Sequence, residues 1–274
     1  MKTFNSWLRA AGLCLIAVIV FAACSKDDDN EKVEEIVEVE NYAPGEIPGL
    51  GEADGELTGK PFQLPDGVEL IDQITGSGSQ YDYWNTNRSA ESTTYPFKMK
   101  NGDIVYRTYT PVTRAGEVRH YFGSGFGFVD LLIPMRNTLS GSVTVTFPAA
   151  TIMRSMNENC QNGVLIKKVT VTIPAKSDYY LCLAFYCGNE YRGAAGGTDK
   201  FELAVVSDAG PLLELCDRVK NKKINLEEYS PTDADARSTY FEIAITLQDI
   251  VWAVTDGEGL TEAYVYYINS LPNS

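Results

Sequence analysis

The hydrophobic periodicity of this 274-residue chain changes about three quarters of the way along. Up to residue 206, short β-branched and aromatic segments are bounded by Gly, Pro, Asn or Ser, which is typical of strands. Among them, Val169, Val171 and Ile173 alternate with threonines, which indicates one buried face. After Gly210 the apolar spacing becomes helical. Strands followed by helices predict an α+β fold, an antiparallel β-sandwich or barrel-like body with a C-terminal helical subdomain.

Three helices are expected in the last quarter. Gly210 and Pro211 are placed to open the first, because proline is favoured in the first helical turn. The second is predicted over residues 247–255, with Thr246 as its N-cap. The third is expected over residues 261–271.

The sequence divides into three parts. Residues 1–23 have the pattern of an export signal, with a basic start and an apolar run too short to span a membrane comfortably. Residues 24–63 are rich in Glu, Asp, Gly and Pro, and residues 26–60 carry twelve acids against three lysines. This composition predicts a disordered, extended acidic tether. Residues 64–274 are then expected to form a single body.

The junction between signal and tether carries a recognisable motif. Phe21, Ala22, Ala23 and Cys24 resemble the lipobox of bacterial lipoproteins, although leucine is usual at the position of Phe21. The resemblance implies cleavage before Cys24 and attachment of palmitate-type lipid to it. The acidic run 25–31 resembles the surface-export signal of lipoproteins from Bacteroidota-type bacteria. We therefore expect a surface-exposed, lipid-anchored protein of the outer membrane. An ordinary cleaved signal and a solvated spacer are the alternatives.

Several functions have little support in the sequence. The net charge of −14 argues against nucleic acid, because phosphate binding needs clustered Lys and Arg. His120 is the only histidine, and its place in an alternating strand favours packing or polar surface over catalysis. The sequence gives no phosphate-binding glycine loop, calcium loop or zinc ligand set, so no metal or cofactor is expected. An enzyme, such as a hydrolase acting on host glycans, has no residue pattern in its favour.

The cysteines are stronger candidates for a functional role than the residues above. Cys160, Cys182, Cys187 and Cys216 remain after export and lipidation, and an exported protein with four cysteines allows up to two disulfides. Cys182 and Cys187 lie five positions apart in one strand, on opposite faces, which disfavours a bond between them. Cys216 falls on the apolar face of its helix, as a small buried hydrophobe would. Cys187 ends its strand before Gly188 and a glycine-rich loop, so its thiol could be reachable.

Two short motifs connect Cys187 with a later glutamine. Cys187 follows two aromatic residues, and Gln248 lies in the order Leu, Gln, two residues, Val, Trp. These motifs resemble those of bacterial thioester domains, surface adhesins in which a cysteine sulfur and a glutamine side-chain carbonyl form an internal thioester. The resemblance covers about residues 140–271. It implies a bond between Cys187 and Gln248, with Tyr186 and Trp252 as aromatic neighbours. The 61 positions between the two residues are fewer than is usual in that family.

A thioester would give the chain a covalent mode of adhesion. The bond needs the thiol and the carboxamide held together and water kept out, and it could then acylate an amine or hydroxyl on a host or matrix protein or glycan. The alternative is a non-covalent surface lipoprotein that recognises glycan or peptide, with its cysteines in disulfides or free. Its candidate contacts are four aromatic residues in a Gly-, Ser- and Asn-rich stretch: Tyr81, Tyr83, Trp84 and Tyr95.

Overall fold

The computed structural model describes residues 39–77, 83–84, 93–98, 104–109 and 117–274, with the backbone alone at 93–98 and 104–109. The predicted signal peptide, Cys24, Tyr81 and the side chain of Tyr95 therefore lie outside the described residues. All described residues belong to one compact unit. Within them, no helix combines the length and the apolar character that a membrane span requires.

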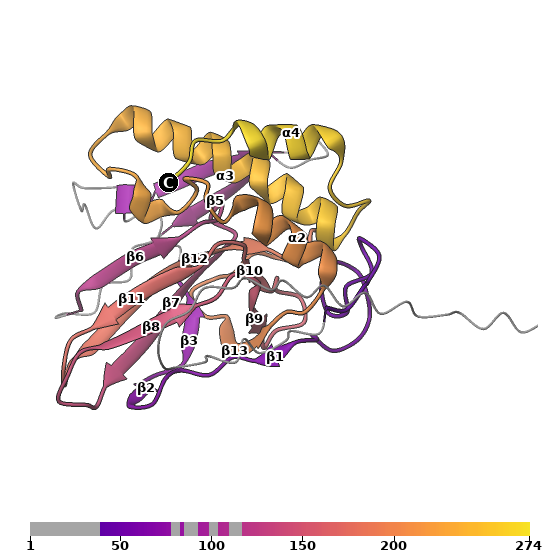
Figure 1. Cartoon of the computed structure of the whole chain (residues 1–274). Helices are drawn as coiled ribbons and strands as arrows, with labels where there is room; N and C mark the ends of the chain where they lie inside the picture. Colours follow the sequence, from indigo (N-terminus) through magenta and orange to yellow (C-terminus); the bar gives the residue numbers. More distant parts are fainter. Residues whose placement is uncertain (1–38, 78–82, 85–92, 99–103, 110–116) are drawn as a thin grey trace, which may run out of the picture. The chain divides into compact units, whose positions relative to one another are not determined.

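The fold is α+β, as predicted, with a barrel-like β body and C-terminal helices (Figure 1). Six strands form the barrel: β3 Ile74–Gly76, β7 Val129–Asn137, β9 Thr151–Ser155, β10 Gly163–Leu165, β12 Asp178–Cys187 and β13 Lys200–Val206. Every pairing is antiparallel, and the order β7, β3, β13, β9, β10, β12 returns to β7. The closed order leaves no exposed edge within this ring.

The remaining strands extend or flank the barrel. β1 Lys60–Pro61 pairs with β13, β2 Val68–Leu70 pairs with β7, and β6 Arg119–Gly123 runs parallel to β12. β8 Val143–Phe147 pairs with β11 Val169–Ile173, and β4 Thr93–Lys98 pairs with β5 Ile104–Tyr109. In β11 the two threonines are exposed and the other three residues are buried, which confirms the predicted alternation.

Strand β12 is the central element of the body and is covered on both faces. Every residue from Leu181 to Cys187 is buried, and β6, β7 and β10 all pair with this strand. Because successive side chains point to opposite faces, Tyr186 and Cys187 join different hydrophobic clusters. Tyr186 belongs to the cluster that contains most of the buried helix residues, whereas Cys187 belongs to the second cluster, which holds mainly strand residues and also Trp252 of α3.

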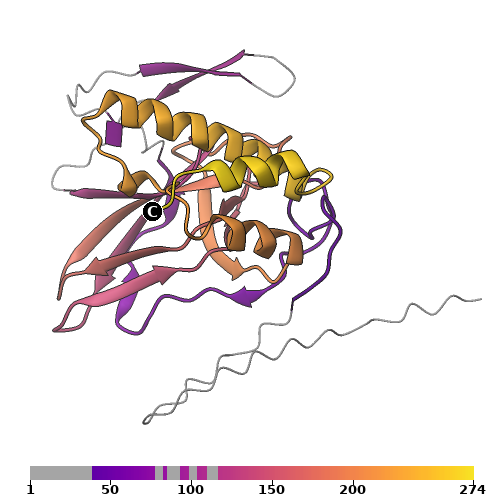
Figure 2. The same cartoon turned by 45° about the horizontal axis from the view of Figure 1, so that its top comes forward.

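Three helices follow the strands: α2 Gly210–Val219, α3 Ala234–Thr255 and α4 Glu262–Ser270, with a short 3-10 turn η1 Leu226–Glu228. Helix α2 contacts both α3 and α4, and the three helices lie together (Figure 2). The apolar face of α2 is buried as predicted, and Cys216 lies on it.

The predicted start of the second helix at residue 247 is wrong. Asp233 caps α3 through hydrogen bonds from the N–H groups of Asp235 and Ala236, and Thr246 lies inside the helix with its hydroxyl bonded to the Glu242 carbonyl.

Residues 39–59 precede β1 and are called the strap below. The sequence assigned them to a disordered tether ending at residue 63, but Ile47 and Leu50 are fully buried in the core cluster that includes the helices. The Glu40 N–H bonds the Asp208 carbonyl at 2.9 Å, and the Gly45 N–H bonds the Val254 carbonyl at 3.0 Å. The predicted boundary is therefore too late. Two isolated apolar residues give no periodic signal, and their burial depends on surfaces formed by distant parts of the chain.

Candidate functional site

Cys187 and Gln248 lie together where the end of β12 meets the middle of α3. The Gln248 side-chain oxygen accepts a hydrogen bond from the Cys187 N–H at 2.9 Å, and the Gln248 Nε2 donates to the Cys187 carbonyl at 3.0 Å. Cys187 has no exposed surface and Gln248 is 1% exposed. The two motifs, 61 positions apart, thus meet in a buried pair in which the carboxamide spans both main-chain groups of the cysteine.

The Cys187 sulfur has its own set of partners. The Trp252 indole N–H donates to it at 3.2 Å, and the Asn189 main-chain N–H donates at 3.4 Å. The thiol in turn faces the Asn189 carbonyl at 3.2 Å. Burial raises the pKa of the Cys187 thiol well above its ordinary value, and the bonds from Trp252 and Asn189 offset part of that rise. The resting sulfur is therefore a protonated thiol that already faces two donors.

Helix α3 explains why Gln248 and Trp252 reach the same cysteine. They are four residues apart, so they lie one above the other on one face of the helix. The Trp252 ring packs against Phe128 with centroids 5.7 Å apart, and this contact belongs to the cluster that contains Cys187. Trp252 is thus a direct neighbour of the sulfur. Tyr186 points the other way, into the helix-side cluster, so it supports the strand rather than contacting the thiol.

The strap covers the loop that follows Cys187. The Gly51 N–H donates to the Gly188 carbonyl at 2.7 Å, and the Asn189 Nδ2 donates to the Gly51 carbonyl at 2.9 Å. The Asn162 side chain adds a bond to the Gly49 carbonyl at 3.0 Å. Leu50, between these two glycines, is fully buried. The strap therefore closes over Gly188 and Asn189 and helps to keep the site dry.

Asp256 lies at the end of α3, beside the same loop. Its carboxylate accepts a hydrogen bond from the Glu190 N–H at 3.2 Å and one from the Thr255 hydroxyl at 2.5 Å. Desolvation raises the pKa of the Asp256 carboxyl to about 6, and the nearby carboxylates of Glu190 and Glu52 act in the same direction. Asp256 thus holds the loop after Cys187 from the end of α3, beside the strap residue Gly51.

The other predicted site residues lie elsewhere. Cys160, Cys182 and Cys216 are buried, and none of the disulfide pairings possible among the four described cysteines is formed. Trp84 is only 6% exposed and packs on Tyr240 of α3, so it is a core residue rather than a ligand contact. Tyr83 is half-buried and donates its hydroxyl to the Tyr229 carbonyl.

His120 lies in β6 and takes no part in the site. Its ring stacks on Tyr179 at 4.2 Å, and partial burial lowers the pKa of the imidazole. In the part of the chain that the structure describes, no group of three His, Cys, Asp or Glu side chains is arranged to hold a metal ion.

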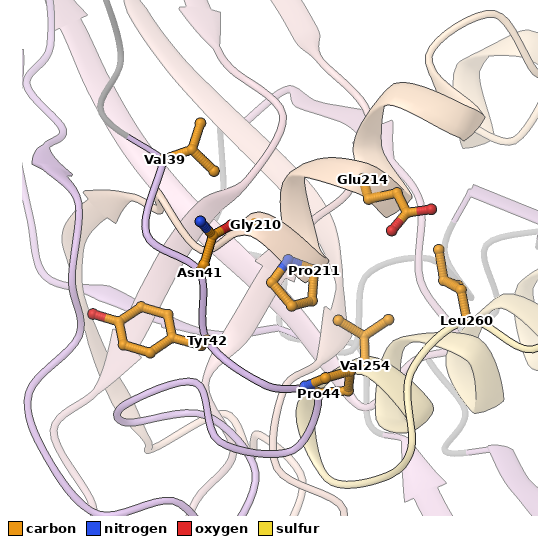
Figure 3. Close-up of a pocket in the computed structure, with 9 residues that line it drawn as sticks. All are labelled: Val39, Asn41, Tyr42, Pro44, Gly210, Pro211, Glu214, Val254 and Leu260. Atoms are coloured by element: carbon orange, nitrogen blue, oxygen red, sulfur yellow. The ribbon is translucent and has the colours of Figure 1, made fainter. Parts of the chain in front are cut away.

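A cavity of about 420 Å³ lies at the start of the strap, not at Cys187 (Figure 3). Its walls come from the strap, α2, α3 and the segment before α4. They are Val39, Asn41, Tyr42, Pro44, Gly210, Pro211, Glu214, Val254 and Leu260. Most of these side chains are apolar, and Glu214 is already paired with Arg218 at 2.7 Å.

Glu227, in η1 and away from Cys187 and Gln248, is an exposed residue whose carboxylate is held by hydrogen bonds. Its carboxylate accepts hydrogen bonds from the Gly123 N–H at 2.8 Å and the Asn225 side chain at 3.1 Å. Desolvation raises the pKa of the Glu227 carboxyl to about 7 from its ordinary 4.5, and these bonds offset only part of the rise. Between pH 4.5 and 7 the folded chain holds a proton that the unfolded chain releases. This carboxyl therefore makes the free energy of unfolding fall as pH rises through that window.

We expect Glu227→Gln to raise the free energy of unfolding at pH 8 by about 0.5–1 kcal/mol, because solvent screens the charge at this exposed residue, and to change it little at pH 4. The amide oxygen can still accept the Gly123 N–H, and no charge is left to desolvate. Urea unfolding at both pH values measures the difference. Glu262→Gln, at an exposed acid in the first turn of α4, is the control and should give a near-zero change at both. Equal effects of Glu227→Gln at pH 4 and pH 8 would contradict the expectation.

Comparisons with protein-family models, curated proteins and solved structures find no match to this chain.

Proposed function

We propose that this chain is a surface adhesin that attaches covalently through an internal thioester between the Cys187 sulfur and the Gln248 side-chain carbonyl. One observation carries the proposal: the Gln248 carboxamide is bonded at 2.9 and 3.0 Å to the main chain of the cysteine that would attack it. A buried carboxamide placed against a buried thiol provides the proximity that this otherwise slow reaction needs.

The hydrogen bonds between Gln248 and the Cys187 main chain favour formation of the thioester. The Cys187 N–H points at Oε1 of Gln248, where negative charge develops when sulfur attacks Cδ. Sulfur then forms the Cδ–Sγ bond, the Cδ–Nε2 bond breaks, and the amide nitrogen leaves with the thiol proton as ammonia. No oxidant or cofactor is needed. The main-chain N–H of Cys187 thus serves as an oxyanion donor for its own side chain.

Burial favours survival of the product. Thioesters are lost to water, and the cysteine, the glutamine and the covering loop are all shielded. The finished bond would acylate an amine or hydroxyl on a host or matrix protein or glycan and release the Cys187 thiol. Lipid at Cys24, as expected from the lipobox, would anchor the chain to the outer membrane with its body outward. The protein would then be bound covalently to the host or matrix surface and held in the outer membrane by its inserted lipid.

Intact mass of the purified compact unit, residues 37–274, tests the proposal under non-reducing conditions. We expect a mass lower than the sequence mass by one ammonia. Methylamine should then add one whole methylamine to that mass and leave a new thiol, because it opens the thioester at Gln248. A disulfide would instead lower the mass by hydrogens and respond to reductant. A mass equal to the sequence mass, with no methylamine uptake, would rule out the thioester.

A further inference from the structure

Asn189 presents both main-chain polar groups to the Cys187 sulfur. Its N–H donates to Sγ at 3.4 Å, and its carbonyl lies 3.2 Å from the same atom, where it can accept the thiol proton. The Trp252 Nε1–H supplies a second donor at 3.2 Å. Two N–H groups from different elements thus converge on one sulfur atom.

The Asn189 side chain fixes this arrangement. It has no exposed surface, and both ends of its carboxamide are used. Its Oδ1 accepts from the Asn162 N–H at 2.9 Å, and its Nδ2 donates to the Gly51 carbonyl at 2.9 Å. Asn162 lies just before β10 and Gly51 lies in the strap. The carboxamide therefore bonds the loop after Cys187 to segments that are 27 and 138 positions away in the sequence.

We propose that Trp252 and Asn189 form a cradle for the departing sulfur of the thioester, with the Asn189 side chain positioning the main-chain donor. This inference rests on the proposed function. When an amine attacks Cδ of Gln248, the Cδ–Sγ bond breaks and its electron pair stays on sulfur. The two N–H groups stabilise that charge until the proton lost by the amine nitrogen reaches the sulfur. Trp252 is then a catalytic residue and Asn189 a positioning residue.

Burial makes such a cradle necessary. A thiolate in a dry site is strongly disfavoured, and the raised pKa of the Cys187 thiol reflects that cost. Donors already aimed at the sulfur lower the barrier without reorganisation, as donors do at other developing charges. In the part of the chain that the structure describes, these two N–H groups are the donors that face the sulfur and can stabilise its charge.

The test is the rate at which the full-length protein captures isotopically labelled methylamine. Trp252→Phe keeps an aromatic ring in the cluster with Phe128 and removes the indole donor, with some loss of packing volume. Asn189→Asp keeps an acceptor for the Asn162 N–H but loses the donor to Gly51. Each change should slow capture about tenfold per folded molecule, as expected for losing one hydrogen bond to a developing charge.

Asn137→Asp is the matched control. Asn137 is equally buried, and its side chain bonds the main chain at Gly141, in the turn after β7, and at Ile173 and Pro174, where β11 ends. Its variant should lower the thermal midpoint and leave the capture rate unchanged.

Wild-type rates in both Trp252→Phe and Asn189→Asp would overturn the cradle. If Asn189→Asp does not fold, Trp252→Phe alone decides. Absence of capture by the wild type would instead overturn the proposed function.

Discussion

Cys187→Ser is expected to abolish methylamine capture and the ammonia mass deficit while leaving the fold in place. A hydroxyl at this position can use the same partners as the thiol, namely the Trp252 N–H, the Asn189 N–H and the Asn189 carbonyl. The bonds between the Cys187 main chain and the Gln248 carboxamide involve no sulfur and should persist. The cost in free energy of unfolding should therefore stay within about 2 kcal/mol.

Gln248→Ala should abolish capture as completely but cost more stability. It removes the partners of the Cys187 N–H and carbonyl, which are buried and would be left without hydrogen bonds. It also leaves a cavity between α3 and the end of β12. Together these effects should lower the free energy of unfolding by about 2–4 kcal/mol, measured by urea unfolding.

Cys182→Ser is the control for both changes. Cys182 is buried in the same strand, five residues before Cys187, and plays no part in the proposed bond. Its variant should keep the mass deficit and the methylamine capture of the wild type. A deficit that survives in Cys187→Ser, or disappears in Cys182→Ser, would show that the wrong cysteine has been assigned.

The α+β fold class was predictable because its signals are local. The threonine alternation of β11 and the buried face of α2 each repeat with one period over several residues. The start of α3 was missed for a physical reason. Its first three turns carry a mixed polar pattern, and their position is set by the Asp233 cap rather than by hydrophobic spacing.

The site was predictable only in part. Cys187 and Gln248 could be named because each lies in a short motif of side chains, and the helical spacing of Gln248 and Trp252 places both on one face. Asn189 could not be assigned a role, because its function depends on main-chain partners at Asn162 and Gly51. The ordered structure of the strap could not be predicted for the same reason. Its composition resembles a flexible linker, and its order comes from main-chain bonds to distant carbonyl and N–H groups.

If the proposed thioester forms, Gly51→Ala is expected to expose it to water and shorten its lifetime at least about tenfold, because a dry site is what preserves such a bond. Gly51 has a φ of +59°, and a Cβ there would lie 2.0 Å from the Thr255 carbonyl oxygen. Since that oxygen belongs to the helix backbone, the strap must move away instead. The movement would break the bonds from Gly51 to Gly188 and Asn189.

Loss of the mass deficit with time at neutral pH measures this lifetime, and hydrogen exchange of the strap amides measures the opening. Gly55→Ala is the matched control. Gly55 lies in the same strap with a φ of +117°, but it is exposed, and a Cβ there would meet only Pro48, at 3.2 Å. Both variants carry backbone strain, yet only Gly51→Ala should release the segment over Gly188. If Gly51→Ala speeds strap exchange and the thioester still lasts as long as in Gly55→Ala, the strap does not protect the bond. In that case the shielding must come from β12, the loop after it and α3 alone.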